Sequence, residues 1–238
     1  MSLVDVTKGP FEQLGGAIVA KDAYVGGVTT AKYKEDECMV FRDDFFGNAL
    51  NPTWTLYISG GGVAGALVNA SPSSYALTSG ATGGQLVRIT RSVPPVDPAT
   101  KYTVLEFRTK LNNVTAAQCS VRMGLFNNFN DCCYLRFDTN SNNWMLYYSK
   151  EGTAPVTIDT GISPIINTFR YWKMEWIDGV LRLYTKLTSA ASWESVDVVV
   201  VAKAVQTALT HPIYFNNTST GTSVVLTIDY VKLYTSRD

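Results

Sequence analysis

Short runs in which apolar and polar residues alternate, separated by turn-forming residues, constrain the fold of this chain more than any other feature of its sequence. From Met39 onward these runs recur about every 8–15 residues, a spacing typical of strands in an all-β domain. One pair is especially clear, because Trp172, Met174 and Trp176 alternate before Asp178-Gly179 and apolar residues alternate again after it. Asp-Gly between two such runs predicts a β-hairpin.

The number of expected strands favours a sandwich over a single sheet. The strands are expected near residues 39–46, 54–58, 62–69, 74–78, 84–91, 102–112, 117–126, 132–138, 143–149, 155–160, 169–177, 180–187, 195–202, 212–216 and 222–235. That many strands cannot lie in one flat sheet without curling or splitting, whereas two stacked sheets bury both inner faces. We therefore expect an all-β, two-sheet antiparallel β-sandwich with no convincing helix.

Length and charge narrow the class of protein further. A chain of 238 residues fits one large β domain, or one domain with an extra arm. Lys plus Arg and Asp plus Glu are both 20, so the formal net charge is zero, which speaks against a nucleic-acid partner or a membrane-surface partner. No apolar run reaches the roughly 18 residues of a membrane-spanning helix, so no span is expected.

Residues 1–38 differ from the rest of the chain, because they are rich in Gly and small residues and show neither helical periodicity nor a long alternating run. We interpret them as an N-terminal arm or linker that docks the chain to an assembly, and residues 39–238 as the sandwich. The first residues lack the basic start and apolar stretch of a signal peptide. Retention in the cytosol, release inside a virus particle and prior removal of a signal remain as interpretations.

The cysteines are expected to be buried free thiols. The chain has four, Cys38, Cys119, Cys132 and Cys133, and no C-x-x-C pair that would indicate a zinc ribbon. The adjacent Cys132 and Cys133 should point to opposite faces of one strand. A disulfide framework is therefore not expected.

Three segments together resemble the concanavalin A-like jelly-roll superfamily, in its laminarinase-like and LamG-like forms. They are FRDDFFGNALNPTW near the start of the β region, YWKMEWIDGVLRLYTKL in its middle and TIDYVKLY at its end. The resemblance spans roughly residues 39–236 and implies two large curved antiparallel sheets. Members include glucanases, lectins, carbohydrate-binding modules and virion surface proteins, and fold alone does not choose among them.

The residues that catalysis would need are not found in the expected patterns. Glucanases of the resembled family carry an E-x-D-x-E run, whose period of two places the carboxylates on one face of a strand. This chain has no such run: Glu106 stands alone, and Glu175 and Asp178 should face opposite sides. His211 is the only histidine and no G-x-S-x-G elbow occurs. We expect no catalytic residues and no enzymatic activity.

The resemblance also implies a structural calcium site. Its ligands would be Asp229 in the last strand and groups near Asp43, Asp44 and Gly47, completed by carbonyls and waters. In the alternative interpretation, Asp229 is a solvent-facing strand residue and Asp43 and Asp44 cap a turn. Calcium is the only cofactor that the sequence suggests.

The strands 117–126 and 132–138 suggest a binding face. If Phe126 pairs with Cys132, Arg122 lies directly opposite Arg136, and two like charges in that position repel. Glu106, Asp138 or a bound anion should compensate, and Arg108 and Lys110 could extend the face. The candidate carbohydrate-binding residues are Arg122, Arg136, Tyr134, Trp144, Tyr147, Asn128 and Asn130.

Each of these candidates also has a simpler interpretation. The outer sheet could be a solvated, salt-bridged surface, and asparagine is an ordinary residue of tight turns. Trp144 is ambiguous between the core and a sugar-binding platform.

Two functions remain at this point. In the first, the chain is a non-enzymatic structural or decoration protein of a virion, namely that of a phage. Residues 1–38 then contact other virion or self subunits, and the displayed jelly roll contacts cell-surface glycans. In the second, the chain is a free carbohydrate-binding module or lectin of microbial origin, secreted or extracellular. Deleting residues 1–38 separates the two hypotheses.

Overall fold

The computed structural model describes most of the chain from Met39 onward. The described residues are 39–46, 49–60, 66–68, 73–80, 85–91, 102–114, 118–128, 131–138, 140–149, 154–177, 180–201, 213–220 and 223–235. They belong to one compact unit, Val40–Asp238, with Met39 at its boundary. The predicted arm, residues 1–38, lies outside the described residues, and so does Cys38.

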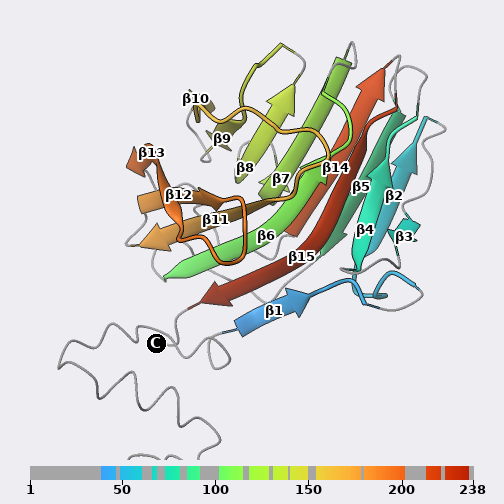
Figure 1. The fold of residues 1–238 in the computed structure, drawn as a ribbon, viewed down its shortest axis with the longest axis horizontal. Coiled ribbons are helices and arrows are strands. Elements are labelled where there is room, and N and C mark those ends of the chain that lie inside the picture. The colour runs from blue at the N-terminus through green and yellow to red at the C-terminus, as the bar shows by residue number, and fades with distance from the viewer. Residues whose placement is uncertain are drawn as a thin grey trace, which may run out of the picture. The chain divides into compact units, whose positions relative to one another are not determined.

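Two antiparallel sheets form a sandwich, as expected (Figure 1). The larger has eight strands in the order β13-β12-β11-β6-β15-β4-β3, with β1 also paired to β15. Its strands are β1 (Met39–Asp43), β3 (Ala66–Val68), β4 (Ser74–Thr78), β6 (Thr103–Leu111), β11 (Arg170–Ile177), β12 (Val180–Lys186), β13 (Glu194–Val201) and β15 (Val225–Thr235).

The smaller sheet has seven strands in the order β10-β9-β8-β7-β14-β5-β2. Its strands are β2 (Thr55–Ser59), β5 (Gln85–Arg91), β7 (Gln118–Asn128), β8 (Asp131–Asp138), β9 (Met145–Ser149), β10 (Val156–Asp159) and β14 (Ile213–Thr220). No helix occurs among the described residues, and none of them forms a helix long and apolar enough to cross a membrane.

Alternation along the strands builds the core, because every second side chain of a strand faces the opposite sheet. Trp172, Met174 and Trp176 of β11 are fully buried, which confirms the predicted inner face of the β11–β12 hairpin. Aromatic contacts cross between the sheets. Phe107 of β6 meets Phe215 of β14 edge to face, with ring centroids 5.6 Å apart.

One carboxylate, that of Asp43, holds the segment that follows β1 through two hydrogen bonds. The two oxygens of Asp43 accept hydrogen bonds from the Trp54 indole N–H and from the Phe45 backbone N–H, both at 2.7 Å. Phe45 adopts a φ of 51°, and its ring stacks on Trp54 and on Tyr75. These contacts give Asp43, Phe45 and Trp54 of the opening segment a shared role, because together they cover one end of the core.

A buried asparagine links the two sheets. The side-chain amide of Asn217 on β14 donates to the carbonyl oxygens of Leu77 (2.7 Å), which belongs to β4, and of Val224 (2.8 Å), which directly precedes β15. Asn217 is fully buried, and next to it the Ser79 and Ser219 hydroxyls lie 2.5 Å apart. A buried carbonyl without a partner is costly, so one side chain here satisfies two groups from the opposite sheet.

We predict that Asn217→Ala lowers the free energy of unfolding by about 2–3 kcal/mol, because the two buried hydrogen bonds that its amide donates across the sheets are lost. Urea titration followed by tryptophan fluorescence measures the change. Asn142→Ala, at an exposed asparagine, is the matched control and should change stability by less than about 0.5 kcal/mol. Equal stabilities of the two variants would contradict the inter-sheet role of Asn217.

Candidate functional site

The register between β7 and β8 confirms the pairing predicted from the sequence. Phe126 lies opposite Cys132, Gly124 opposite Tyr134, and Arg122 opposite Arg136. The intervening residues belong to the core: they are Val121, Met123, Leu125, Cys133, Leu135 and Phe137. The two arginines therefore lie on the outer face of the seven-stranded sheet.

The structure extends this pair into a row of arginines that runs across the sheet. Asn216 of β14 lies opposite Arg122 on one side and opposite Arg88 of β5 on the other. Arg88 in turn lies opposite Tyr57 of β2. We call Arg136, Arg122 and Arg88 the arginine row.

Tyrosines occupy the neighbouring register row on the same face. Tyr147 lies opposite Tyr134, which lies opposite Gly124, and Gly124 lies opposite Tyr214. The rings of Tyr134 and Tyr147 stack with centroids 4.8 Å apart, and Phe126 stacks on Tyr214 at 4.7 Å. Together with the arginine row and Tyr57, these aromatic residues form what we call the arginine–tyrosine face.

Gly124 makes the close packing of this face possible. A Cβ atom at this position would lie 2.4 Å from the Cys133 carbonyl oxygen and 2.9 Å from Cβ of Tyr134. Any side chain here would therefore push β8 away from β7. The glycine lets Tyr134 lie directly over the neighbouring strand.

Burial divides the face into two layers. Tyr134 and Tyr214 are only 1% and 3% exposed, so their rings form a floor and cannot stack on a ligand. The arginines are half-buried above them. The Arg122 guanidinium lies 5.7 Å from the Tyr134 ring centroid, and that of Arg88 lies 4.6 Å from the Tyr57 centroid. Tyr57, at 47% exposed, and the half-buried Tyr147 are the rings that a ligand can reach.

The charges on the face are balanced only in part. Asp138 pairs with Arg136 at 2.5 Å, which is one of the compensations predicted for the opposed arginines. Glu106, the other predicted carboxylate, lies on β6 of the opposite sheet, and that prediction is wrong. Among the described residues, no carboxylate pairs with Arg88, which contacts the Tyr57 ring and the Tyr214 hydroxyl.

The tyrosines of the floor remain neutral over a wide pH range. Burial raises the pKa of Tyr214, and the nearby Arg122 and Arg88, both hydrogen-bonded to its hydroxyl, only partly oppose that rise. Burial likewise raises the pKa of Tyr134 and of Tyr147. The floor therefore contributes hydrogen-bonding hydroxyls and no negative charge.

The structure corrects the assignment of Trp144. Its side chain is buried in the core, where it meets Trp172 edge to face at 5.7 Å and Phe137 at 5.6 Å. It therefore cannot serve as a sugar-binding platform on the arginine–tyrosine face. Trp144 directly precedes β9, and this position places its side chain between the sheets. The sequence around Trp144 is that of a loop and does not predict this burial.

The remaining predicted extensions of the face are placed as follows. Asn128 pairs through its backbone with Asp131 at the end of the β7–β8 hairpin, whereas Asn130 lies outside the described residues. Arg108 and Lys110 are on β6, where both side chains contact the Phe169 ring, so they belong to the eight-stranded sheet.

The carboxylates predicted to bind calcium all have protein partners. Asp229 is buried and pairs with Arg108 at 2.7 Å, which also corrects the alternative that it faces solvent. Asp44 pairs with Arg42, and Asp43 accepts the two hydrogen bonds described above. Gly47 lies outside the described residues. Within the described residues no three His, Cys, Asp or Glu side chains gather as a metal site, and the calcium site stays a prediction.

Two glutamates do share a face, although the sequence did not predict it. Glu106 of β6 lies opposite Lys173 of β11, and Glu175 lies two residues further along β11. Both side chains therefore belong to the outer face of the eight-stranded sheet. Glu175 accepts a hydrogen bond from the Tyr102 hydroxyl at 2.6 Å and lies 3.9 Å from the Lys173 ammonium.

The three described cysteines are buried free thiols. Cys133 belongs to the core, whereas Cys132 belongs to the opposite face beside Ser149, as their adjacency predicted. Burial raises the pKa of Cys119 and of Cys132 to about 12, so the protonated thiol dominates at neutral pH. A thiol in that state is a poor nucleophile.

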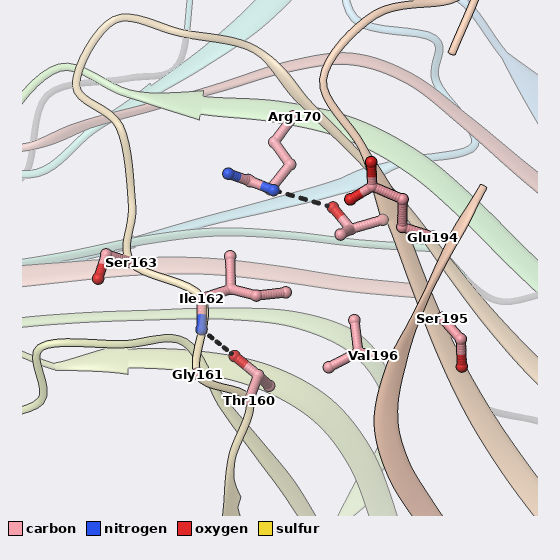
Figure 2. A pocket seen from close by; sticks show the side chains of 9 residues that line it. Thr160, Gly161, Ile162, Ser163, Arg170, Glu194, Ser195 and Val196 are labelled. Carbon is pink, nitrogen blue, oxygen red and sulfur yellow. Dashed lines mark hydrogen bonds between the residues drawn. The ribbon is translucent and has the colours of Figure 1, made fainter. Parts of the chain in front are cut away.

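A separate hollow of about 490 Å³ lies beside the start of β11, where residues 160–163 pass close to β12 and β13 (Figure 2). Arg170 and Glu194 line it together with Ile162 and Val196. The Arg170 guanidinium donates to the Thr185 hydroxyl at 3.3 Å. Burial lowers the pKa of Arg170, and the negative charge of Glu194 opposes this effect in part. The hollow pairs a cation with an anion, in contrast to the arginine row.

Solved structures with a similar fold include binding proteins and a hydrolase. One is a structure of botulinum neurotoxin type C, a toxin whose cell entry depends on interaction with two ganglioside molecules. It has a TM-score of 0.57 at 11% identity. The match covers 84% of this chain and 48% of that one, so this chain spans about half the length of the toxin structure. A binding domain of botulinum neurotoxin DC in complex with rat synaptotagmin II has a TM-score of 0.55 at 10% identity, covering 84% and 49%.

A glycoside hydrolase family protein from Mycobacterium thermorestibile has a TM-score of 0.57 at 13% identity, and the match covers 82% of this chain and 100% of that one. No protein-family model and no curated protein matches the sequence. At these identities the likeness establishes the jelly-roll fold and nothing finer.

We predict that the native thiols react slowly with a disulfide reagent such as DTNB, because the raised pKa of Cys119 and Cys132, about 12 for each, leaves almost no thiolate at pH 8. A Cys38→Ser variant removes the thiol outside the described residues. Its labelling should be at least about 100-fold slower in buffer than in 8 M urea, measured by absorbance. Equal rates would show that the thiols are accessible in the folded chain.

Proposed function

We propose that this chain is a carbohydrate-binding jelly roll that holds glycans on its arginine–tyrosine face and does not cleave them. The observation that carries the proposal is the arginine row, in which guanidinium groups from three strands share one register row above a floor of buried tyrosines. A fold shared with a ganglioside-interacting toxin and with a glycoside hydrolase family protein supports a sugar ligand.

The chemistry of the face suits a polyhydroxylated ligand. A guanidinium group offers five N–H donors in a fixed planar arrangement, which can reach the ring and hydroxyl oxygens of a sugar. The half-buried Tyr147 and the exposed Tyr57 lie at opposite ends of the face and can pack against sugar C–H groups. A ligand could therefore be hydrogen-bonded in the middle and packed at its ends.

The absence of catalysis is part of the proposal. Glycosidases need two carboxylates that flank one bond, roughly 5–9.5 Å apart. On the arginine–tyrosine face, Asp138 is held in its ion pair with Arg136. Glu106 and Glu175, a carboxylate pair that would favour an enzyme, lie on the other sheet, where Tyr102 and Lys173 engage Glu175. A reducing-end assay on the glycans that bind, with Glu175→Gln as comparison, tests this alternative.

We propose virion display as the setting of this binding function. The chain would be a structural or decoration protein of a phage that exposes its jelly roll while residues 1–38 contact other virion or self subunits. The composition of residues 1–38 supports this setting, because a Gly-rich arm can adapt to a partner surface. A secreted, free-standing module is the alternative setting.

Binding to a glycan array, followed by calorimetry on the best ligand, tests the function. We expect Tyr57→Ala to weaken binding about 3- to 10-fold, because an exposed ring at the end of the face is lost. Phe46→Ala removes an exposed ring next to β1 and should bind as the wild type does. If the array gives no ligand, or if Arg170→Gln alone abolishes binding, the arginine–tyrosine face is not the site.

Light scattering on the full chain and on residues 39–238 tests the setting. We expect the full chain to form a defined oligomer and the truncated chain to be a monomer that keeps its glycan affinity. Two monomers would favour the free-standing module, and loss of glycan affinity on truncation would place part of the site in residues 1–38.

A further inference from the structure

We propose that the glycan bound by the arginine–tyrosine face is acidic, and that Arg88 and Arg122 together clamp one of its carboxylate or sulfate groups above Tyr214. This inference rests on the proposed function and adds to it the class of ligand.

The two guanidinium groups converge although their strands are not adjacent. Arg122 is on β7 and Arg88 on β5, with β14 between them, so their Cα atoms lie about 10 Å apart at roughly 4.8 Å per strand. Both side chains nevertheless reach the Tyr214 hydroxyl on β14 and form hydrogen bonds to it. The side chains therefore lean toward each other across the middle strand.

This convergence brings like charges to a neutral acceptor. The phenol oxygen has lone pairs for both donors, but it carries no charge to offset their repulsion. Burial raises the pKa of Tyr214, so ionisation of the hydroxyl does not supply that charge near neutral pH. An oxyanion placed between the two groups would replace repulsion with charge-assisted hydrogen bonds, which are the strong kind.

Arg88 differs in its partners from other arginines of the described chain. Arg136 has Asp138, Arg108 has Asp229 and Arg42 has Asp44, at 2.5–2.7 Å in each case. Arg88 has no carboxylate partner among the described residues, and its Nε–H, like that of Arg108 and of other arginines of the described chain, is buried without a hydrogen-bond acceptor. A buried donor on a cation is costly to leave unsatisfied, and a ligand oxyanion would satisfy it.

The surroundings of the clamp favour an acidic sugar over a free inorganic anion. The Tyr57 ring lies directly beneath Arg88 and is 47% exposed, so the sugar ring next to the acidic group has an aromatic surface to pack against. An anion such as phosphate would use the arginines alone. The shared chemistry is an oxyanion attached to a sugar ring, and carboxylate and sulfate sources are separated by experiment.

The experiment is calorimetry of the full chain with three matched oligosaccharides: a uronic acid oligomer, the same oligomer with its carboxylates reduced to hydroxymethyl groups, and a sulfated oligomer of equal length. We expect the acidic oligomers to bind at least about tenfold more tightly than the reduced one, with an affinity that falls as NaCl rises from 50 to about 300 mM. The tighter of the two acidic oligomers identifies the acid.

Variants then assign the effect to the clamp. Arg88→Gln and Arg122→Gln should each weaken binding of the acidic oligomer about 10- to 100-fold and weaken binding of the reduced one clearly less, so that the preference for the acidic oligomer falls below about threefold. Arg182→Gln is the control, because it makes the same charge change at an exposed arginine on the other sheet. Melting temperatures within a few degrees of the wild type show that each variant is folded.

The two proposals fail in different ways. Equal affinity for the acidic and the reduced oligomers, with both weakened in Tyr57→Ala, would overturn the clamp and keep glycan binding on this face. Binding that no variant of the face alters would overturn both proposals. An affinity for free sulfate or phosphate equal to that for the oligomers would show an anion site and overturn the acidic glycan as the ligand.

Discussion

The packed inner face of the seven-stranded sheet determines where every functional side chain on its outer face lies. Period-two alternation means that the residues facing the core and those facing outward are locked into one register. In β7 and β8 the core takes Val121, Met123, Leu125 and their partners, and a slip of one residue would bury Arg122 and Arg136 instead. The arginine row is therefore held in place by apolar packing on the opposite side of the same strands.

The outer face has to be stabilised against its own charge. Two opposed arginines would repel each other in water and more strongly when half-buried. Asp138 forms an ion pair with Arg136 and offsets one of the two charges. The guanidinium groups of Arg88 and Arg122 lie over tyrosine rings, and a cation is attracted to the face of an aromatic ring. Gly124 permits this arrangement, because its missing side chain leaves room for Tyr134.

Local patterns predicted the parts of the fold that local chemistry controls. The two-sheet sandwich, the β11–β12 hairpin and the β7–β8 register all followed from alternation and turns between strands close in sequence. Arg88, Asn216 and Tyr214 escaped prediction as site residues, because β5 and β14 meet β7 only through pairing between distant segments.

Burial accounts for the other errors of the sequence interpretation. Tyr134 was rightly placed on the face, but its ring is covered by neighbours contributed from several strands. Trp144 follows a turn, a position at which sequence alone does not distinguish exposure from burial, and Trp172 of the opposite sheet covers it. Asp229 of β15 pairs with Arg108 of the neighbouring strand β6. The two residues are 121 positions apart in the sequence, so local patterns could not predict this ion pair.

The two outer faces of the sandwich differ in whether their cationic side chains are paired with carboxylates, and this difference indicates which face is available to a ligand. On the eight-stranded sheet, cations meet carboxylates within the chain: Arg108 pairs with Asp229, and Lys173 lies between Glu106 and Glu175. On the seven-stranded sheet, the described residues leave Arg88 with aromatic and hydroxyl contacts only. Internal ion pairs must be broken before a ligand can use their charges, and that cost lowers affinity. A cation that already lies half-buried over tyrosines, without a carboxylate to release, has its desolvation cost largely met by folding, so an incoming oxyanion gains more there than on the other face.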